Sequence, residues 1–199
     1  NHHIAPMPGE DFQMFEKDLP GKSTQGYNEE SEVGELPLEM CMTMYGSGSW
    51  GFTLLDTKFK TITENIRDLV QAAGYNSNFQ LNVGPMPNGA IQPEFVDALN
   101  GIGEWLQIFG ETIYGTRGGP VQPQPWGVTT QKDNRVFVHI LNWNNRAFIL
   151  PKIAGKISAV QVFHTGDKVR FSINDFGTAI RLPEAYLGMI DLVLEIKLK

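Results

Sequence analysis

The sequence of 199 residues predicts an α/β fold: the C-terminal part of a (β/α)8 barrel of the TIM type, followed by an antiparallel β-sandwich. In residues 38–109, two apolar runs typical of strands alternate with two helical patterns. After residues 118–125, which are rich in glycine and proline, the hydrophobic period changes to two. We therefore expect a barrel portion over residues 1–119 and an accessory β-sandwich domain over residues 120–199.

The first predicted βα unit begins with residues 38–45, a nearly continuous apolar run typical of a parallel strand buried on both faces. Apolar residues then recur at helical spacing up to Ala73. Thr61 and Glu64 have the spacing of a capping box, and Gly74 is placed to end the helix.

The second unit has a predicted strand over residues 79–83 and a helical stripe that starts near Pro93 and stops before Gly110. Residues 1–36 show no periodicity and are predicted to form a long loop. Two βα units cannot close a barrel of eight, so the sheet is either open or completed by sequence outside these residues. The abrupt N-terminal loop favours the second interpretation.

The predicted sandwich consists of short alternating segments separated by turn signals. These segments are residues 128–131, 135–141, 147–150, 159–163, 169–173 and 190–197. In the last of them, every second residue from Leu192 to Leu198 is apolar, which indicates one buried face.

Composition argues against several classes of function. The formal net charge is -6 and no run of lysine or arginine forms a patch, so a nucleic-acid partner is not expected. No window approaches the roughly 20 apolar residues of a membrane span. The single cysteine, Cys41, allows neither an internal disulfide nor a cysteine metal site, and we expect a buried structural thiol.

Three carboxylates are candidates for acid–base chemistry. Glu10 and Glu16 lie among aromatic and apolar residues, where a carboxyl group keeps its proton to higher pH, as a general acid must. The simpler interpretation is that both are solvated loop acids. Glu39 interrupts a predicted buried strand, so it is either functional or part of a structural ion pair.

Aromatic and polar residues near the predicted strand ends are candidates for binding. Trp50 and Phe52 follow the first strand, on what would be the active face of a barrel, where an aromatic ring can stack on a sugar. Trp50 could equally plug the barrel mouth. His2 and His3 could line a polar pocket or be ordinary loop residues, and their spacing does not indicate a metal site. Asn82 ends the second strand, where structural hydrogen bonding is the favoured interpretation.

Several strings occur in an order that resembles the family 29 α-L-fucosidases over residues 1 to about 130. They are Gly9-Glu10-Asp11-Phe12, Phe15-Glu16-Lys17, Leu38-Glu39-Met40-Cys41-Met42-Thr43-Met44, Ser49-Trp50-Gly51-Phe52, Leu81-Asn82-Val83-Gly84-Pro85 and Gly110-Glu111-Thr112-Ile113-Tyr114-Gly115-Thr116-Arg117. The sandwich is compatible with this family, which carries a C-terminal β domain.

The resemblance implies a glycoside hydrolase that releases terminal α-linked L-fucose from glycans by a retaining double displacement. It implies an aspartate nucleophile outside this segment and Glu16 as the acid/base, with Glu39 and Glu10 as alternates. Trp50 matches a tryptophan that contacts fucose. The remainder of the barrel is then a required partner, and the substrate is a fucosylated oligosaccharide or glycoconjugate.

The resemblance also implies a periplasmic or secreted location, and no metal or organic cofactor. Two other functions remain open at this point. A fucose-binding protein on the same fold would bind the sugar without cleaving it, and a hydrolase of the same architecture would act on another sugar.

Overall fold

The structure, a computed structural model, describes residues 7–21, 33–34, 36–142, 146–186 and 188–199. Contacts between residues divide the chain into two compact units, Asn1–Gln107 and Ile108–Lys199, which are described separately. The second unit includes residues 108–119, which the sequence analysis assigned to the barrel portion.

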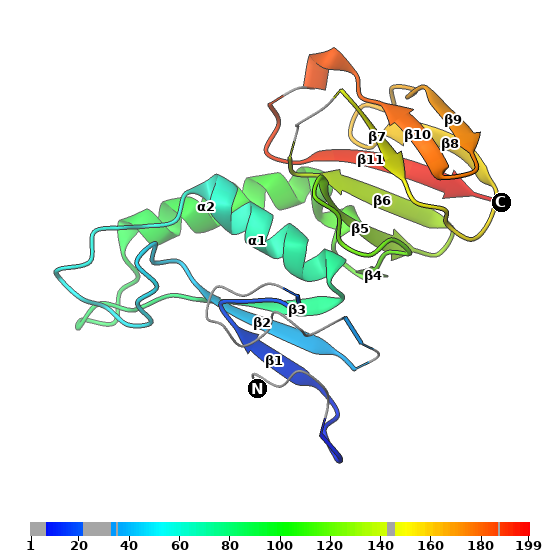
Figure 1. The fold of residues 1–199 in the computed structure, drawn as a ribbon. Coiled ribbons are helices and arrows are strands. Elements are labelled where there is room, and N and C mark those ends of the chain that lie inside the picture. Colours follow the sequence, from blue (N-terminus) through cyan, green and yellow to red (C-terminus); the bar gives the residue numbers. More distant parts are fainter. Residues whose placement is uncertain (1–6, 22–32, 35, 143–145, 187) are drawn as a thin grey trace. The chain divides into compact units, whose positions relative to one another are not determined.

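The first unit contains a three-stranded parallel sheet in the order β1-β2-β3, together with helices (Figure 1). Its strands are β1 (Gln13–Glu16), β2 (Leu38–Thr43) and β3 (Ser77–Asn82). Helix α1 (Ile62–Gly74) connects β2 to β3, and α2 (Pro93–Phe109) follows β3. This βαβα order confirms the two units predicted from the sequence.

Strand β1 corrects the prediction of an unstructured opening loop. Its four residues are too short to show a hydrophobic period, and they form a strand because they pair with β2, from Gln13 opposite Leu38 to Glu16 opposite Cys41. Tertiary pairing therefore decides this element. The correction places Glu16 at the end of a strand instead of within a loop.

Helix α1 begins as the sequence predicts. The Glu64 backbone N–H donates to Thr61 Oγ1 over 3.2 Å, and the Thr61 backbone N–H donates to Glu64 Oε2 over 2.7 Å, which completes the capping box. The helix buries Ile66 and Val70, and it ends at Gly74.

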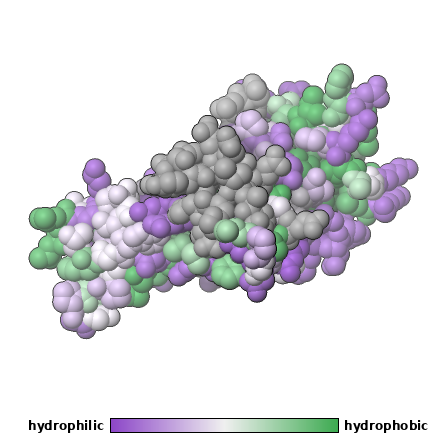
Figure 2. All heavy atoms as spheres, turned by 60° about the horizontal axis from the view of Figure 1, so that its bottom comes forward, coloured by the Kyte–Doolittle hydropathy of each residue, from purple (hydrophilic) through white to green (hydrophobic). Residues whose placement is uncertain are grey.

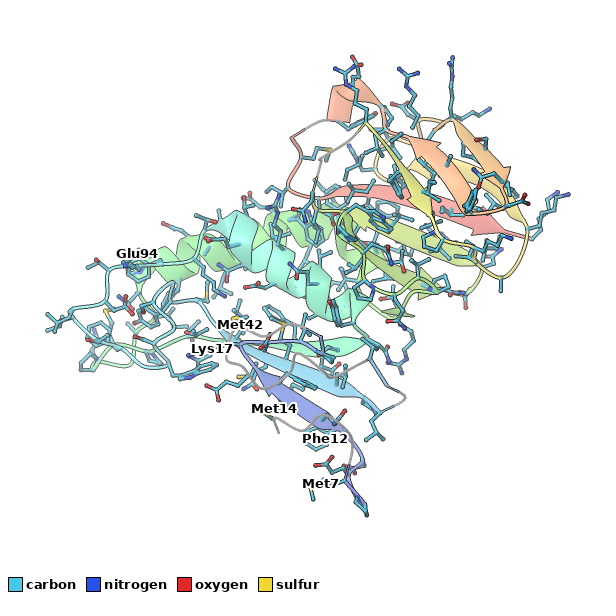
Figure 3. The ribbon with its side chains drawn as sticks, in the orientation of Figure 1. Met7, Phe12, Met14, Lys17, Met42 and Glu94 are labelled. Carbon is cyan, nitrogen blue, oxygen red and sulfur yellow. The ribbon has the colours of Figure 1, made fainter. Side chains whose placement is uncertain are left out.

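The two faces of the parallel sheet differ in polarity because side chains alternate along each strand. Phe15 and Met40 are buried on one face, whereas Glu16, Glu39 and Cys41 belong to the other. Figure 3 shows Met42 on the side of the sheet where the helices lie and Met14 on the opposite side. The face away from the helices therefore carries the polar side chains.

The second unit is an antiparallel sandwich, as predicted. A five-stranded sheet has the order β4-β5-β6-β11-β8, and a three-stranded sheet has the order β7-β10-β9. The strands are β4 (Arg117–Gly118), β5 (Gly127–Lys132), β6 (Arg135–Ile140), β7 (Ala147–Leu150), β8 (Ile157–Val162), β9 (Phe171–Asn174), β10 (Gly177–Arg181) and β11 (Leu192–Leu198). Two short 3-10 helices, η1 (Gly110–Thr112) and η2 (Glu184–Tyr186), complete the unit.

One apolar cluster fills the sandwich. It joins residues such as Val138 and Leu194 of the larger sheet to Leu150 and Ile180 of the smaller sheet. Strands β4 and β10 were not predicted from the sequence. Within the described ranges, no helix is both long and apolar enough to cross a membrane.

Candidate functional site

The site is built where the three parallel strands end. Glu16, Thr43 and Asn82 are the last residues of β1, β2 and β3. Thr43 lies opposite Asn82 in the sheet register, and Glu16 lies opposite Cys41, two residues before Thr43. In parallel α/β barrels, catalytic side chains occupy this carboxyl edge of the sheet.

Glu16 and Trp50 are in direct contact at this edge. The indole Nε1–H of Trp50 donates to Glu16 Oε1 over 3.0 Å, and the Glu16 side chain is exposed. Lys17 Nζ lies 4.8 Å from the centre of the indole ring, the geometry of a cation–π contact. A carboxylate, an aromatic face and a cation thus converge from two segments of the chain.

The loop that carries Trp50 is held by the neighbouring strand ends. Thr43 Oγ1 donates to the Ser49 carbonyl over 2.6 Å, and Asn82 Nδ2 donates to the Trp50 carbonyl over 2.7 Å. Gly84 packs directly beneath the same loop, since a Cβ atom added there would lie 2.7 Å from the backbone nitrogen of Phe52. The backbone around Trp50 is therefore held in place by contacts with Thr43, Asn82 and Gly84.

The other predicted carboxylates lie elsewhere. Glu10 precedes β1, and its Oε2 accepts a hydrogen bond from the Met7 backbone N–H over 2.9 Å. Glu39 is the second residue of β2 and lies opposite Met14. Figure 3 shows Met7 and Phe12 at one end of β1 and Lys17 at the other. Of the three candidate glutamates, Glu16 is the one at the carboxyl edge.

Of the remaining predicted binding residues, the structure describes Phe52 but not the two histidines. Phe52 is half-buried on the loop after Trp50. His2 and His3 lie outside the described residues. Tyr45, the residue that follows Met44 after β2, is buried: its ring meets Phe95 edge-on at 4.8 Å.

Cys41 lies on the polar face of the sheet, in register with Glu16. Its thiol is half-buried instead of fully buried as expected. Burial raises the pKa of Cys41, and the negative charges of Glu39 and Glu16 raise it further, whereas Lys17 opposes them. The sulfur is therefore held as a thiol at neutral pH.

Sequence reasoning missed Lys17 and Thr43 as parts of the site. Lys17 follows Glu16 with a left-handed backbone (φ 57°), which turns the chain at the end of β1. Thr43 could have been found from the sequence, because it is a polar residue at the end of an otherwise apolar strand. In the part of the chain that is described, no group of three or more histidine, cysteine or carboxylate residues could hold a metal ion.

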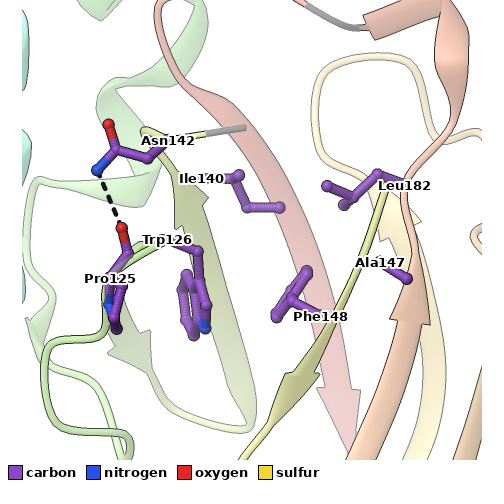
Figure 4. A pocket seen from close by; sticks show the side chains of 7 residues that line it. All are labelled: Pro125, Trp126, Ile140, Asn142, Ala147, Phe148 and Leu182. Atoms are coloured by element: carbon purple, nitrogen blue, oxygen red, sulfur yellow. Dashed lines mark hydrogen bonds between the residues drawn. The ribbon is translucent and has the colours of Figure 1, made fainter. Parts of the chain in front are cut away.

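The second unit contains a separate pocket of about 150 Å³ (Figure 4). The rings of Trp126 and Phe148 lie 4.8 Å apart in its wall, and Asn142 Nδ2 donates to the Pro125 carbonyl over 3.0 Å. None of the described residues that line it carries a carboxyl group. The lining residues are Pro125, Trp126, Ile140, Asn142, Ala147, Phe148 and Leu182.

The chain is similar to known fucosidases in sequence and in structure. A family model described as Alpha-L-fucosidase matches residues 1–111. The tissue alpha-L-fucosidase of Rattus norvegicus is 37% identical over 113 residues, which cover 53% of this chain and 24% of that protein. The tissue alpha-L-fucosidase of Bos taurus is 32% identical over 160 residues, which cover 75% of this chain and 34% of that protein.

Among solved structures, alpha-L-fucosidase isoenzyme 1 from Paenibacillus thiaminolyticus superposes with a TM-score of 0.78 at 29% identity. The match covers 95% of this chain and 45% of that one, so the chain spans less than half the length of these relatives. The matched architecture confirms the predicted fold class, the C-terminal part of a barrel followed by a sandwich. Because the family model covers more than half of the residues, the chain belongs to the α-L-fucosidase family.

Proposed function

We propose that this chain is part of a retaining α-L-fucosidase and that Glu16 is its acid/base. The observation that carries the proposal is the Glu16–Trp50 contact at the carboxyl edge of the parallel sheet. It combines a carboxylate, which can protonate a glycosidic oxygen, with an aromatic face, which can stack on the bound sugar.

In the proposed reaction, Glu16 donates its proton to the glycosidic oxygen while an aspartate attacks the anomeric carbon and the leaving group departs. Glu16 then removes a proton from water, whose oxygen displaces the aspartate and restores the anomeric configuration. We place the nucleophilic aspartate on another strand of the barrel, outside these 199 residues. A retaining enzyme requires the two carboxyl groups to lie roughly 5–5.5 Å apart.

The sugar-binding part of the proposal assigns Trp50 and Phe52 to the fucose unit. An apolar surface there would accommodate the C6 methyl group, which distinguishes fucose from sugars with a hydroxymethyl group. His2 and His3 remain proposed contacts to the substrate. A fucosylated glycan is the proposed substrate, and a periplasmic or secreted location is the proposed setting, to be checked by cell fractionation.

The test is hydrolysis of an aryl α-L-fucoside and of a natural fucosylated glycan by the full-length protein. We expect Glu16→Gln to lower turnover of the glycan by on the order of 10²- to 10⁴-fold, because a poor leaving group needs the acid. The activated aryl fucoside should still react in the first step, and added azide should yield a fucosyl azide of retained configuration.

Glu10→Gln and Glu39→Gln serve as matched controls that remove the same charge elsewhere. If Glu16→Gln changes nothing and one control shows the expected profile, the acid/base role belongs to that control residue. A wild-type protein that binds fucose without cleaving it would indicate the non-catalytic alternative. Faster cleavage of another aryl glycoside would indicate a different substrate.

A further inference from the structure

The loop that presents Trp50 to Glu16 is anchored by the side chains of Thr43 and Asn82, which donate hydrogen bonds to its backbone carbonyls. We infer that Asn82 and Thr43 are positioning residues, which hold Trp50 so that its indole N–H orients the Glu16 carboxylate. This inference rests on the proposed acid/base role of Glu16.

The two anchors come from neighbouring strands at the same level of the sheet. Thr43 pairs with Asn82 in the β2–β3 register, and the Met44 backbone N–H extends this pairing by donating to the Asn82 carbonyl over 3.1 Å. Thr43 is buried, with 1% of its surface exposed. The sheet therefore provides a rigid base from which both side chains reach the loop.

The anchors act on consecutive peptide groups of the loop. Thr43 holds the carbonyl of Ser49, and Asn82 holds the carbonyl of Trp50, at 2.6 and 2.7 Å. Gly84 supports the next two residues, because a Cβ atom there would also lie 2.8 Å from the carbonyl carbon of Gly51. With four successive residues supported, the indole position depends mainly on the Trp50 side-chain torsions.

This arrangement matters because Glu16 is exposed and its side chain has several rotatable bonds. One hydrogen bond from a fixed indole selects a single orientation of the carboxylate out of many. A general acid must meet the leaving oxygen within hydrogen-bond reach, and a misplacement of about 1 Å can cost on the order of 10²-fold in rate. Loosening the loop should thus weaken acid catalysis while Glu16 itself is unchanged.

The experiment uses variants that remove each anchor with little change in size. Asn82→Asp replaces the amide donor with an oxygen that repels the Trp50 carbonyl, and Thr43→Val removes the hydroxyl that holds Ser49. Thr43→Ser keeps that hydroxyl. Asn78→Asp is the matched control, since Asn78 is an exposed residue on the same strand and face and the substitution adds the same charge.

We expect Asn82→Asp and Thr43→Val to lower kcat on the glycan by on the order of tenfold, with about twofold or less on the activated aryl fucoside. Thr43→Ser and Asn78→Asp should stay within about twofold of wild type on both substrates. An equal loss on both substrates, or equal effects of Asn82→Asp and Asn78→Asp, would overturn the inference.

The Trp50 indole N–H resonance gives a readout that does not depend on activity. Glu16→Gln should move this resonance because its hydrogen-bond acceptor changes, and Asn82→Asp should move or broaden it without any change at Glu16. If wild type cleaves no fucoside but Asn82→Asp perturbs the resonance, the proposed function fails while the positioning role stands. If the resonance is insensitive to Asn82→Asp, the positioning role fails.

Discussion

At the scale of single residues, the most informative side chain after Glu16 is Cys41. The negative charges of Glu39 and Glu16 add to burial in raising the pKa of its thiol. Because the thiolate is the form that reacts, alkylation of Cys41 by iodoacetamide should be slow near neutral pH and accelerate as the pH rises. Glu39→Gln removes one negative neighbour, so we expect about 2- to 10-fold faster labelling at a fixed pH, measured at Cys41 by mass spectrometry.

Two further variants sharpen the interpretation of that rate. Gln80 lies opposite Cys41 on β3, so Gln80→Glu should slow the labelling by adding a negative charge. Glu104→Gln, on the exposed surface of α2, should leave the labelling rate unchanged. Equal rates in all four proteins would mean that access, not charge, controls the thiol.

At the scale of elements, the start of α1 makes a defined contribution to stability. Removing the cap hydroxyl in Thr61→Ala should lower the free energy of unfolding by about 1 kcal/mol, as measured by urea unfolding at neutral pH. The hydrogen bonds that Thr61 donates to Glu64 lower the pKa of that carboxyl group in the folded chain. Their contribution is therefore present above the pKa of the unfolded state and is lost as the pH falls through the folded-state pKa.

The pH dependence of the free energy of unfolding distinguishes the contribution of the Glu64 carboxylate from that of the Thr61 hydroxyl. The stability difference between wild type and Glu64→Gln should be largest at neutral pH, and it should shrink as the pH falls below the ordinary glutamate pKa of about 4.3 and through the lower folded-state pKa. Glu104→Gln, in the body of α2, is the control. A difference that stays constant with pH would show that the capping box is not ionised.

Helix α1 and strand β10 show which elements could be predicted from the sequence. Helix α1 was predictable because its cap and its apolar period are local. Strand β10 was not, because it starts at Gly177, where φ is 143° and a Cβ atom would lie 2.1 Å from the Leu150 carbonyl oxygen. This close approach requires a glycine, and in the sequence a glycine indicates a turn more readily than the start of a strand.

The site was predictable in its parts but not in its assembly. Glu16 and Trp50 were both candidates, yet their contact joins residues 34 positions apart and depends on the pairing of β1 with β2. No local pattern carries that information. The anchoring role of Thr43 likewise follows only from where the loop returns to the sheet.

The first unit also exposes two leucines that its own core does not use. Leu54 and Leu55 are 84% and 94% exposed at a turn where the Asp56 backbone N–H donates to the Thr53 carbonyl over 3.3 Å. Figure 2 shows hydrophobic surface among polar atoms at the end of this unit where the loops after β2 and β3 lie. The apolar surface thus belongs to the same edge of the sheet as the candidate site.

At the scale of the whole molecule, the question is where the sandwich begins as a folding unit. Its apolar cluster starts at Val121. Several contacts nevertheless reach further back in the chain: Thr130 Oγ1 donates to the Thr112 carbonyl over 2.7 Å, and the Phe109 ring lies 6.2 Å from that of Phe163. Strand β4 also pairs with β5.

We therefore expect a fragment of residues 108–199 to fold and to be more stable than a fragment of residues 120–199. The shorter fragment loses the buried Phe109 ring and the hydrogen bond from Thr130 to the Thr112 carbonyl, a cost of about 3 kcal/mol or more. Urea unfolding followed by near-ultraviolet circular dichroism would measure this difference in the free energy of unfolding.

In the longer fragment, Phe109→Ala should reproduce much of the loss, whereas Ile108→Ala, at an exposed neighbouring position, should not. Equal unfolding midpoints for the two fragments would instead place the start of the sandwich at residue 120, because the residues before it would then add nothing to its stability.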